Sequence, residues 1–330
     1  MRVLFAGSPG IAVPALRAIA GGDAVRPEAV RPAVELAGVL TNPDRRRGRG
    51  GGGEPTEVGA AAALLAEAYR RRGKEFALFK PLTLDAAFRR EAAGRFDLLV
   101  SFAYGRIFGP KFLALFPLGG INVHPSLLPK YRGPSPIPAA ILGGDRETGV
   151  TIQTLAAEMD SGDILAQERF PLTGRETTAS LGERAAEKAA LMLPPLLAGI
   201  AAGTVRGRPQ DHAAASYCSL ITREEGRIDW SMGAGDIDAR IRAFTPWPLC
   251  WTLHGGQELC VLEARPYGGA FPPSGAPPGA VLGIDKQWGI LIQTGNGILA
   301  AERLQYRTKK ALGWKDFLNG VRTFAGARLS

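Results

Sequence analysis

At 330 residues the chain exceeds one ordinary domain, and two domains of common size are expected. Hydrophobic residues make up 45%, which excludes a disordered chain, and 40 Lys and Arg against 31 Asp and Glu give a net charge of +9, which favours a polyanionic partner. Three cysteines without a CxxC pair exclude a disulfide framework and a cysteine-rich zinc site, and no apolar run reaches membrane-spanning length, so we expect a soluble, cytoplasmic protein.

The first two hundred residues alternate short apolar runs with segments of helical periodicity. The predicted strands cover residues 3–6, 36–41, 96–102, 120–124 and 151–155. The predicted helices cover residues 11–20, 60–72 and 178–200. Because the strands are apolar on both faces and alternate with helices, we predict a doubly wound, mostly parallel, Rossmann-like α/β domain.

The sequence changes character after residue 203, where a polar, linker-like stretch runs to about residue 219. A short helix is predicted over residues 234–244. Closely spaced strands are then predicted at 250–253, 259–264, 280–284, 290–294 and 298–304. Gly-Gly and Asn-Gly between such runs are typical of hairpins, and five short strands suggest a small OB-like β-barrel. We therefore predict an N-terminal domain over 1–206, and a linker with a C-terminal domain over 207–330.

The first glycine-rich turn, Gly7-Ser8-Pro9-Gly10, does not predict a dinucleotide site. Its spacing differs from GxGxxG, and Thr41-Asn42 stands at the end of the second strand, where an acidic residue would hold a ribose. We interpret it as a tight connection between strand and helix.

A polar pair on an apolar strand marks the most informative stretch, residues 120–165. Asn122 and His124 are two residues apart, so their side chains leave the strand on the same face. An Asn amide suits a developing oxyanion, and a His is a general acid or base or, when protonated, a second donor. Because polar groups are costly to bury without a purpose, we predict that this pair is catalytic.

Other residues near this pair extend the candidate site. Asp160, in a Met-Asp-Ser-Gly-Asp turn, is available to orient or charge His124. The apolar loop 126–129 either binds a flat heterocycle through its backbone or packs as an ordinary loop. The sequence has no GxSxG elbow and no HExxH spacing, and His212 and His254 are interpreted as bystanders. Direct transfer between two bound substrates is therefore favoured over a covalent acyl-enzyme.

Two basic clusters favour binding to nucleic acid. One holds Arg45, Arg46, Arg47 and Arg49 among glycines. The other, residues 303–315, contains Arg303, Arg307, Lys309, Lys310 and Lys315, interleaved with Tyr306 and Trp314. A charge run is usually a solvated face, but two such runs, one of them on an OB-like barrel, favour a nucleic-acid partner.

Motifs along nearly the whole chain resemble the folate-dependent formyltransferase family. Those in the N-terminal half are VLFAGSPGIAVPALRAI, NPDRRRGRG, AYGRIFGP, INVHPSLLPKYRGPSPI and MDSGDIL. In the second half, EEGRIDW, IRAFTPWP and GNGIL resemble the family members that formylate methionyl-tRNA. The resemblance implies transfer of a formyl group from 10-formyltetrahydrofolate to the α-amino group of methionine on initiator methionyl-tRNA, for translation initiation, by a monomer without a metal.

Carried over residue by residue, the resemblance makes Asn122, His124 and Asp160 the catalytic set. It implies a folate site along Ser126, Leu127, Leu128 and Pro129. It implies tRNA contacts at Arg45, Arg46, Arg47, Arg49, Arg303, Arg307, Lys309 and Lys310. Three departures from the family pattern stand out, namely Pro125 after the His, Tyr131 where Trp is frequent, and Gly51-Gly52 in place of a lysine pair. The last weakens the charge of the loop, which the additional Arg46 and Arg47 are expected to offset.

Two alternatives remain open at the level of sequence. Amino-sugar formyltransferases share the catalytic motifs and part of the second half. A non-catalytic RNA-binding module belongs to a different class, and the intact set of Asn122, His124 and Asp160 argues against it.

Overall fold

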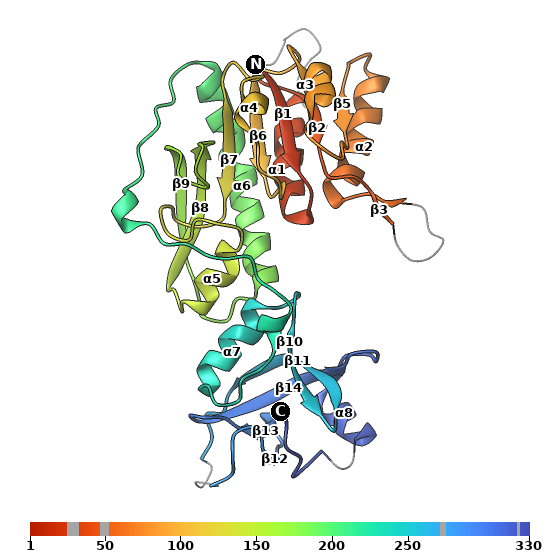
Figure 1. Cartoon of the computed structure of the whole chain (residues 1–330), viewed down its shortest axis with the longest axis vertical. Helices are drawn as coiled ribbons and strands as arrows, with labels where there is room; N and C mark the ends of the chain where they lie inside the picture. Colours follow the sequence, from red (N-terminus) through yellow and green to blue (C-terminus); the bar gives the residue numbers. More distant parts are fainter. Residues whose placement is uncertain (25–32, 47–52, 271–274, 322–323) are drawn as a thin grey trace. The chain divides into compact units, whose positions relative to one another are not determined.

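The computed structural model describes residues 1–24, 33–46, 53–270, 275–321 and 324–330, which form two structural units (Figure 1). The first contains Met1–Pro136, Glu147–Phe170 and Gly182–Cys218, and the second contains Ile137–Arg146, Pro171–Leu181 and Ser219–Ser330. Since both units are discontinuous in sequence, the predicted boundary at 206–207 stays a prediction. None of the helices in the described ranges is long and apolar enough to cross a membrane.

Seven strands form the sheet of the first unit: β1 (Arg2–Gly7), β2 (Glu35–Leu40), β5 (Ala77–Phe79), β6 (Leu98–Phe102), β7 (Gly120–His124), β8 (Glu147–Thr154) and β9 (Ile164–Pro171). Their order is β5-β2-β1-β6-β7-β8-β9. The strands from β5 to β7 are parallel, and β8 is antiparallel to β7. The residues Val3–Ala6 of β1 are fully buried, as expected for a strand covered on both faces. The predicted mostly parallel α/β sheet is confirmed.

The helices among these strands are η1 (Gly10–Ala12), α1 (Val13–Ala24), α2 (Glu57–Arg71), α3 (Ala86–Ala92), α4 (Pro110–Leu113), α5 (Pro136–Leu142) and α6 (Thr178–Ala201). Thr56 begins α2 by accepting a hydrogen bond from Gly59 N at 2.9 Å, and Asp85 begins α3 by accepting one from Phe88 N at 3.0 Å. Helix α6 buries a side chain at every fourth position, namely Leu181, Ala185, Ala189, Leu193 and Leu197. This spacing gives the helix one continuous apolar stripe.

The register around β7 sets four polar side chains on one face of the sheet. Asn122 is opposite Gln153, and His124 is opposite Thr151. Directly opposed residues of an antiparallel pair share a face, as do residues two apart on one strand. The predicted shared face of Asn122 and His124 therefore extends to the two polar residues of β8.

The sequence prediction missed β5 and β9. Strand β9 carries Gln167, Glu168 and Arg169 between its apolar ends, so it lacks the uninterrupted apolar run on which the other strands were predicted. Strand β5 has only three residues.

The second unit contains an antiparallel sheet of β10 (Cys250–His254), β11 (Gln257–Pro266), β12 (Val281–Asp285), β13 (Gly289–Gln293), β14 (Ile298–Tyr306) and β15 (Leu312–Gly313). The order is β10-β11-β14-β13-β12, with β15 beside β14. Helices η3 (Glu224–Gly226), α7 (Ala234–Ala243) and α8 (Trp314–Gly320) accompany it. All five predicted strands and the predicted helix are present, each within three residues of the predicted bounds.

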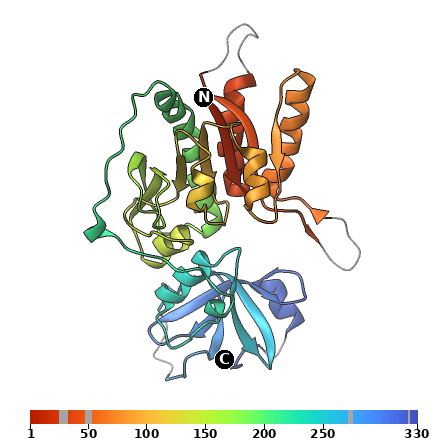
Figure 2. The same ribbon diagram turned by 45° about the horizontal axis from the view of Figure 1, so that its top comes forward.

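Residues 326–330 bridge the two outer strands of this sheet. Leu253 of β10 and Ser330 exchange backbone hydrogen bonds of 2.8 and 3.1 Å, and Val281 of β12 donates to Ala327 O at 2.9 Å. These bonds supply partners for strand edges that would otherwise be unpaired. The segment thus closes the sheet into the small barrel seen in Figure 2.

Two connecting segments carry structure that the sequence did not predict. Strands β3 (Arg45–Arg46) and β4 (Gly53–Glu54) form a short hairpin, in which Arg45 is opposite Glu54. The segment 207–218, predicted as a linker, contains η2 (His212–Ala214). It pairs through Arg208 with Ile164 of β9 and through Tyr217 with Arg132. This segment is therefore bound along the first unit.

Candidate active site

The carboxylate of Asp160 lies at the centre of a polar cluster at the end of β7. Its Oδ1 accepts hydrogen bonds from Gln153 Nε2 at 2.9 Å and from Asn122 Nδ2 at 3.4 Å. Its Oδ2 accepts one from Gly133 N at 2.9 Å and lies 3.5 Å from His124 Nδ1. The three residues predicted as a catalytic set therefore lie in direct contact.

His124 is buried between two oxygen acceptors. Its Nε2 lies 2.8 Å from the carbonyl oxygen of Tyr131, and its Nδ1 faces Asp160. Only the protonated ring donates from both nitrogens. Burial, the strongest influence, lowers the pKa of His124, while the charge of Asp160 and the Tyr131 carbonyl oppose that shift. The protonation of this ring therefore depends directly on where the Asp160 carboxylate is held.

The turn that carries Asp160 has an uncommon backbone conformation. Asp160 has φ +54°, in the left-handed region where most side chains are disfavoured. At Gly162, a Cβ would lie 1.8 Å from the carbonyl oxygen of Thr154, so only glycine fits. Asp163 N donates to Thr154 Oγ1 at 2.9 Å and closes the turn. The Met-Asp-Ser-Gly-Asp sequence thus presents one carboxylate on a fixed, tight turn.

The apolar loop 126–129 is fixed by two polar side chains from neighbouring strands. Thr151 Oγ1 donates to Ser126 O at 2.7 Å and accepts from Leu128 N at 3.2 Å. Gln167 Nε2 donates to Leu128 O at 3.0 Å. Ser126 and Leu128 are buried, whereas Leu127 and Pro129 are partly exposed. The loop therefore has a rigid backbone with apolar side chains at its surface, close in sequence to His124.

The first basic cluster lies on the β3–β4 hairpin. Arg45 is exposed at the base of the hairpin, where Asp44 forms a 2.6 Å ion pair with Lys80. The backbone of Arg46 pairs with Gly53. Arg47 and Arg49, like Gly51-Gly52, lie outside the described residues.

The second basic cluster is partly neutralised by acidic residues from the adjacent strand. Arg303 lies 3.1 Å from Glu263, and Arg307 lies 3.3 Å from Glu258, which also binds Arg223. Lys309 lies over the Tyr306 ring at 5.5 Å, and Lys310 is exposed. Counting charges along 303–315 therefore overstated the positive charge of this surface, because both carboxylates come from β11.

Several residues of the site were missed in the sequence. Gln153 and Thr151 alternate with apolar residues on β8, and that alternation next to the Asn-x-His strand was an available signal. Gln167 lies on the strand that was not predicted. Arg132 contacts Gln210, which contacts the Asp160 turn, although no periodic pattern marks either residue. Of the two histidines interpreted as bystanders, His212 accepts from Arg132 Nη2 at 3.1 Å, and His254 lies 2.6 Å from Tyr306 OH.

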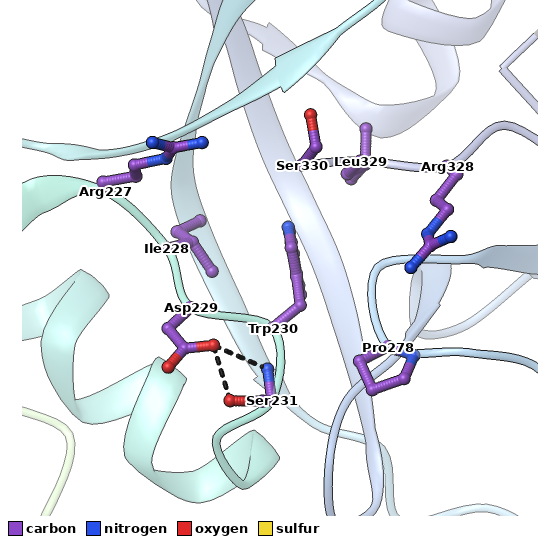
Figure 3. Close-up of a pocket in the computed structure, with 9 residues that line it drawn as sticks. All are labelled: Arg227, Ile228, Asp229, Trp230, Ser231, Pro278, Arg328, Leu329 and Ser330. Carbon is purple, nitrogen blue, oxygen red and sulfur yellow. Dashed lines mark hydrogen bonds between the residues drawn. The ribbon is translucent and has the colours of Figure 1, made fainter.

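A pocket of about 470 Å³ lies in the second unit, apart from the predicted catalytic residues in sequence and fold (Figure 3). Asp229 accepts from Ser231 N and Oγ at 2.9 and 2.6 Å, while Trp230 Nε1 donates to Thr252 Oγ1 at 3.0 Å. The lining of this pocket includes none of the residues predicted to be catalytic. Within the described ranges no cluster of three His, Cys, Asp or Glu residues could hold a metal ion.

Comparison with known protein families gives two matches. The model named "Formyl transferase" matches residues 15–197, and the model named "Formyl transferase, C-terminal domain" matches residues 220–322. Together they span most of the chain and include every predicted catalytic residue.

Curated relatives match over nearly their whole length. A methionyl-tRNA formyltransferase of Treponema denticola is 47% identical over 98% of this chain and 98% of its own, and one of Roseiflexus sp. is 40% identical over 100% and 95%. Among solved structures, an N-formyltransferase from Helicobacter canadensis with folinic acid and dTDP-3-aminofucose gives a TM-score of 0.61 at 20% identity, covering 91% of this chain and 98% of that one. HypX from Aquifex aeolicus in complex with tetrahydrofolic acid gives a TM-score of 0.60 at 20% identity, and the match covers 88% of this chain and 48% of that one. These structures establish the fold alone.

Proposed function

The chain belongs to the formyl transferase family, and we propose that it transfers a formyl group from 10-formyltetrahydrofolate to the α-amino group of methionine on initiator methionyl-tRNA. The observation that carries this proposal is the match, at 40–47% identity and almost full length, to relatives named for that reaction. Neighbours that act on amino sugars share the fold at 20% identity or less. The tRNA substrate is therefore better supported than the sugar.

In the proposed reaction, the methionyl amine attacks the formyl carbon in its neutral form. The bond from this carbon to the amine nitrogen forms, the bond to N10 of the folate breaks, and the amine's proton passes to N10. Asn122 Nδ2 donates a hydrogen bond to the formyl oxygen as negative charge develops on it, and His124 donates a second one when its Nε2 turns from the Tyr131 carbonyl to that oxygen. Asp160 holds both donors through its two oxygens and helps to take the ammonium proton. Tetrahydrofolate and formylmethionyl-tRNA are the products.

The loop 126–129 fits a folate. A pterin is flat and apolar on its faces and has polar groups at its edge, so it needs a rigid surface with both kinds of group. Leu127 and Pro129 offer apolar surface, and Thr151 and Gln167 hold the backbone between them in place. Bound there, the folate supplies the formyl group within reach of Asn122 and His124.

The proposal extends to the partners and the location of the protein. Arg45 on the β3–β4 hairpin and Lys310 are exposed and available to tRNA phosphates. We place the protein in the cytoplasm, where initiator tRNA is charged and used. Asn122, His124 and Asp160 come from one chain, so a monomer is sufficient. Two donors and a carboxylate supply the charge stabilisation and proton transfer, so the proposed steps require no metal. The division at 206–207 remains part of this proposal.

A competition among acceptors tests the proposed function. Formylfolate is offered to the full-length protein with initiator methionyl-tRNA, glycinamide ribonucleotide or an amino-sugar nucleotide, and formylated product is measured. We expect product from the tRNA and none from the other two. Formylation of the sugar nucleotide alone would replace the proposed substrate.

A further inference from the structure

The segment 207–218 is hydrogen-bonded to the loops around Asp160 and Pro129, although its sequence is typical of a linker. Arg208 and Ile164 exchange backbone hydrogen bonds of 2.9 and 2.8 Å just after the Asp160 turn. Ser216 N donates to Pro129 O at 3.2 Å, and Arg132 N donates to Ser216 O at 2.8 Å. A segment bound at both ends to the loops around the site holds its middle residues in a fixed place.

Gln210, in the middle of this segment, is almost completely buried and uses its whole amide. Its Nε2 lies 2.9 Å from Asp160 O, 2.7 Å from Gly162 O and 3.0 Å from Gln153 Oε1. Its Oε1 accepts from Arg132 Nε at 3.1 Å and from Arg132 Nη2 at 2.7 Å. One side chain thus connects the backbone of the Asp160 turn with a residue of β8 that binds the Asp160 carboxylate.

Arg132 fixes the direction of these hydrogen bonds. A guanidinium only donates, so the Gln210 oxygen must face Arg132 and the Gln210 nitrogen must face the turn. The Gln210 nitrogen then requires the oxygen of Gln153, which leaves the Gln153 nitrogen to donate to Asp160 Oδ1 at 2.9 Å. Every amide in the chain of contacts from Arg132 to Asp160 therefore has one permitted orientation.

Arg132 is itself suited to this role because it is held rigidly. It is 2% exposed, and its guanidinium contacts Gln210, His212 Nδ1 at 3.1 Å and Tyr217 OH at 3.3 Å. All of these contacts come from the segment 207–218. The buried guanidinium of Arg132 stabilises an amide whose oxygen points toward it. Without such acceptors, burying this charge would be costly.

We propose that Gln210 is a positioning residue for the catalytic carboxylate: with Arg132 and Gln153 it holds Asp160 in the geometry that aligns Asn122 and His124. This inference rests on the proposed catalytic role of Asp160. Asp160 has a left-handed backbone, and its carbonyl oxygen accepts a hydrogen bond from Gln210 rather than from a residue of its own turn. The inference therefore gives the connecting segment 207–218 a part in catalysis.

The test replaces Gln210 by Met, which has a similar length and no hydrogen-bonding group, in the full-length protein. The control is Asp211→Asn, since Asp211 is adjacent and exposed, and its side chain accepts from Ala213 N, a bond that Asn keeps. Thermal unfolding shows whether each variant folds. Initial rates give kcat and KM for formylfolate and charged tRNA.

A second readout is independent of turnover. The chain has three histidines, so NMR titration resolves His124 once His212 and His254 are assigned by substitution. The charged group that faces His124 is Asp160, and burial raises the pKa of the nearby Cys218 thiol, so Cys218 stays neutral through the titration. If Gln210 holds Asp160 in place, its loss lowers the pKa of His124 further, because the stabilising carboxylate moves away.

We expect Gln210→Met to lower kcat by about 10- to 100-fold with little change in the KM for tRNA, as a displaced catalytic group does. We also expect the His124 titration to move to lower pH, and Asp211→Asn to behave as wild type. If the Met variant does not fold, Gln210→Glu retains a partner for Arg132 but cannot donate, and the same loss of kcat is expected. A kcat within threefold of wild type with an unshifted His124 titration overturns the proposal. If wild type formylates no tRNA but the titration shifts, the proposed function fails and the positioning role stands.

Discussion

At the scale of single residues, the site depends on one carboxylate that serves several donors at once. Asp160 accepts from Gln153, Gly133 and Asn122 and faces His124. A carboxylate has about four lone-pair directions, so each donor is held where its neighbours leave room. The orientation of Asn122 and His124 toward a substrate is therefore set by Asp160 rather than by either side chain alone.

Replacing Asn122 by Ala tests the donor role. The amide is needed mainly in the transition state, so turnover should fall by about 100- to 1000-fold while the affinity for tRNA stays close to wild type. Steady-state rates and a binding titration on the same preparation measure both. A loss of only a few-fold would remove Asn122 from the proposed mechanism.

The burial of His124 predicts how stability depends on pH. Its pKa is lowered in the folded protein, so between its ordinary value of about 6.5 and the lower folded value the unfolded chain binds more protons. This contribution to stability is complete above about pH 6.5 and is lost as pH falls toward the folded value. In urea unfolding from pH 7 to pH 5, wild type should therefore lose more free energy of unfolding than His124→Gln. The pKa of His254 is also lowered, but His254 is present in both proteins, so its effect cancels. Parallel losses in the two proteins would contradict a neutral, buried His124.

At the scale of elements, the barrel of the second unit depends on its closing segment. Leu329 is 2% exposed, and its backbone N donates to Gly279 O at 2.9 Å, next to β12. Leu329→Ala leaves a cavity and should lower the free energy of unfolding by about 2–4 kcal/mol. Ile284→Ala, on β12 but 50% exposed, is the matched control and should cost much less. Chemical denaturation followed by tryptophan fluorescence compares them, and equal losses would argue against a tight closure at Leu329.

The same scale shows what the sequence could and could not predict. Most strands of both sheets follow from short apolar runs, because burial leaves that pattern in the sequence. The shared face of Asn122 and His124 follows from their spacing of two residues within such a run. The role of Gln210 depends on its contacts with Gln153, Asp160 and Gly162, which lie 48 to 57 positions earlier in the chain and leave no local pattern. The pairing of Arg303 with Glu263 depends on a register with bulges between β11 and β14, which short-range rules do not give.

At the scale of the whole molecule, the net charge of +9 supports binding to a polyanion, but its distribution decides where. Arg303 and Arg307 already face carboxylates, so a phosphate must compete with Glu263 and Glu258 for them. The segment 42–53 has four arginines and one acidic residue, Asp44, which is paired with Lys80, and Glu54 is opposite Arg45 in the hairpin. The arginine-rich segment 45–49 is therefore expected to supply more of the salt-dependent affinity than the basic cluster at 303–315.

Salt titration of tRNA binding tests this distribution. Each neutralised phosphate releases condensed counterion, so the logarithm of affinity falls with the logarithm of salt concentration in proportion to the number of phosphates neutralised. Changing Arg45, Arg46, Arg47 and Arg49 to Ala should flatten that slope by about 3, since each phosphate that an arginine neutralises contributes roughly 0.7–0.9, and should lower formylation of charged tRNA. Formyl transfer to a small amine should hardly change, because the loop does not include Asn122 or His124.

The matched control changes two arginines of the barrel instead. The double variant Arg303→Ala, Arg307→Ala removes two arginines that are already ion-paired. The change in slope per arginine removed should therefore be less than half of that for the variant of residues 45–49. Dissociation constants measured at several salt concentrations for wild type and both variants decide between the two surfaces. If wild type and the loop variant gave equal, shallow slopes, neither cluster would be binding a polyanion, and the amino-sugar reaction would become the better proposal. A larger change in the barrel variant would instead place the tRNA on β14 and require Glu258 and Glu263 to release their arginines on binding.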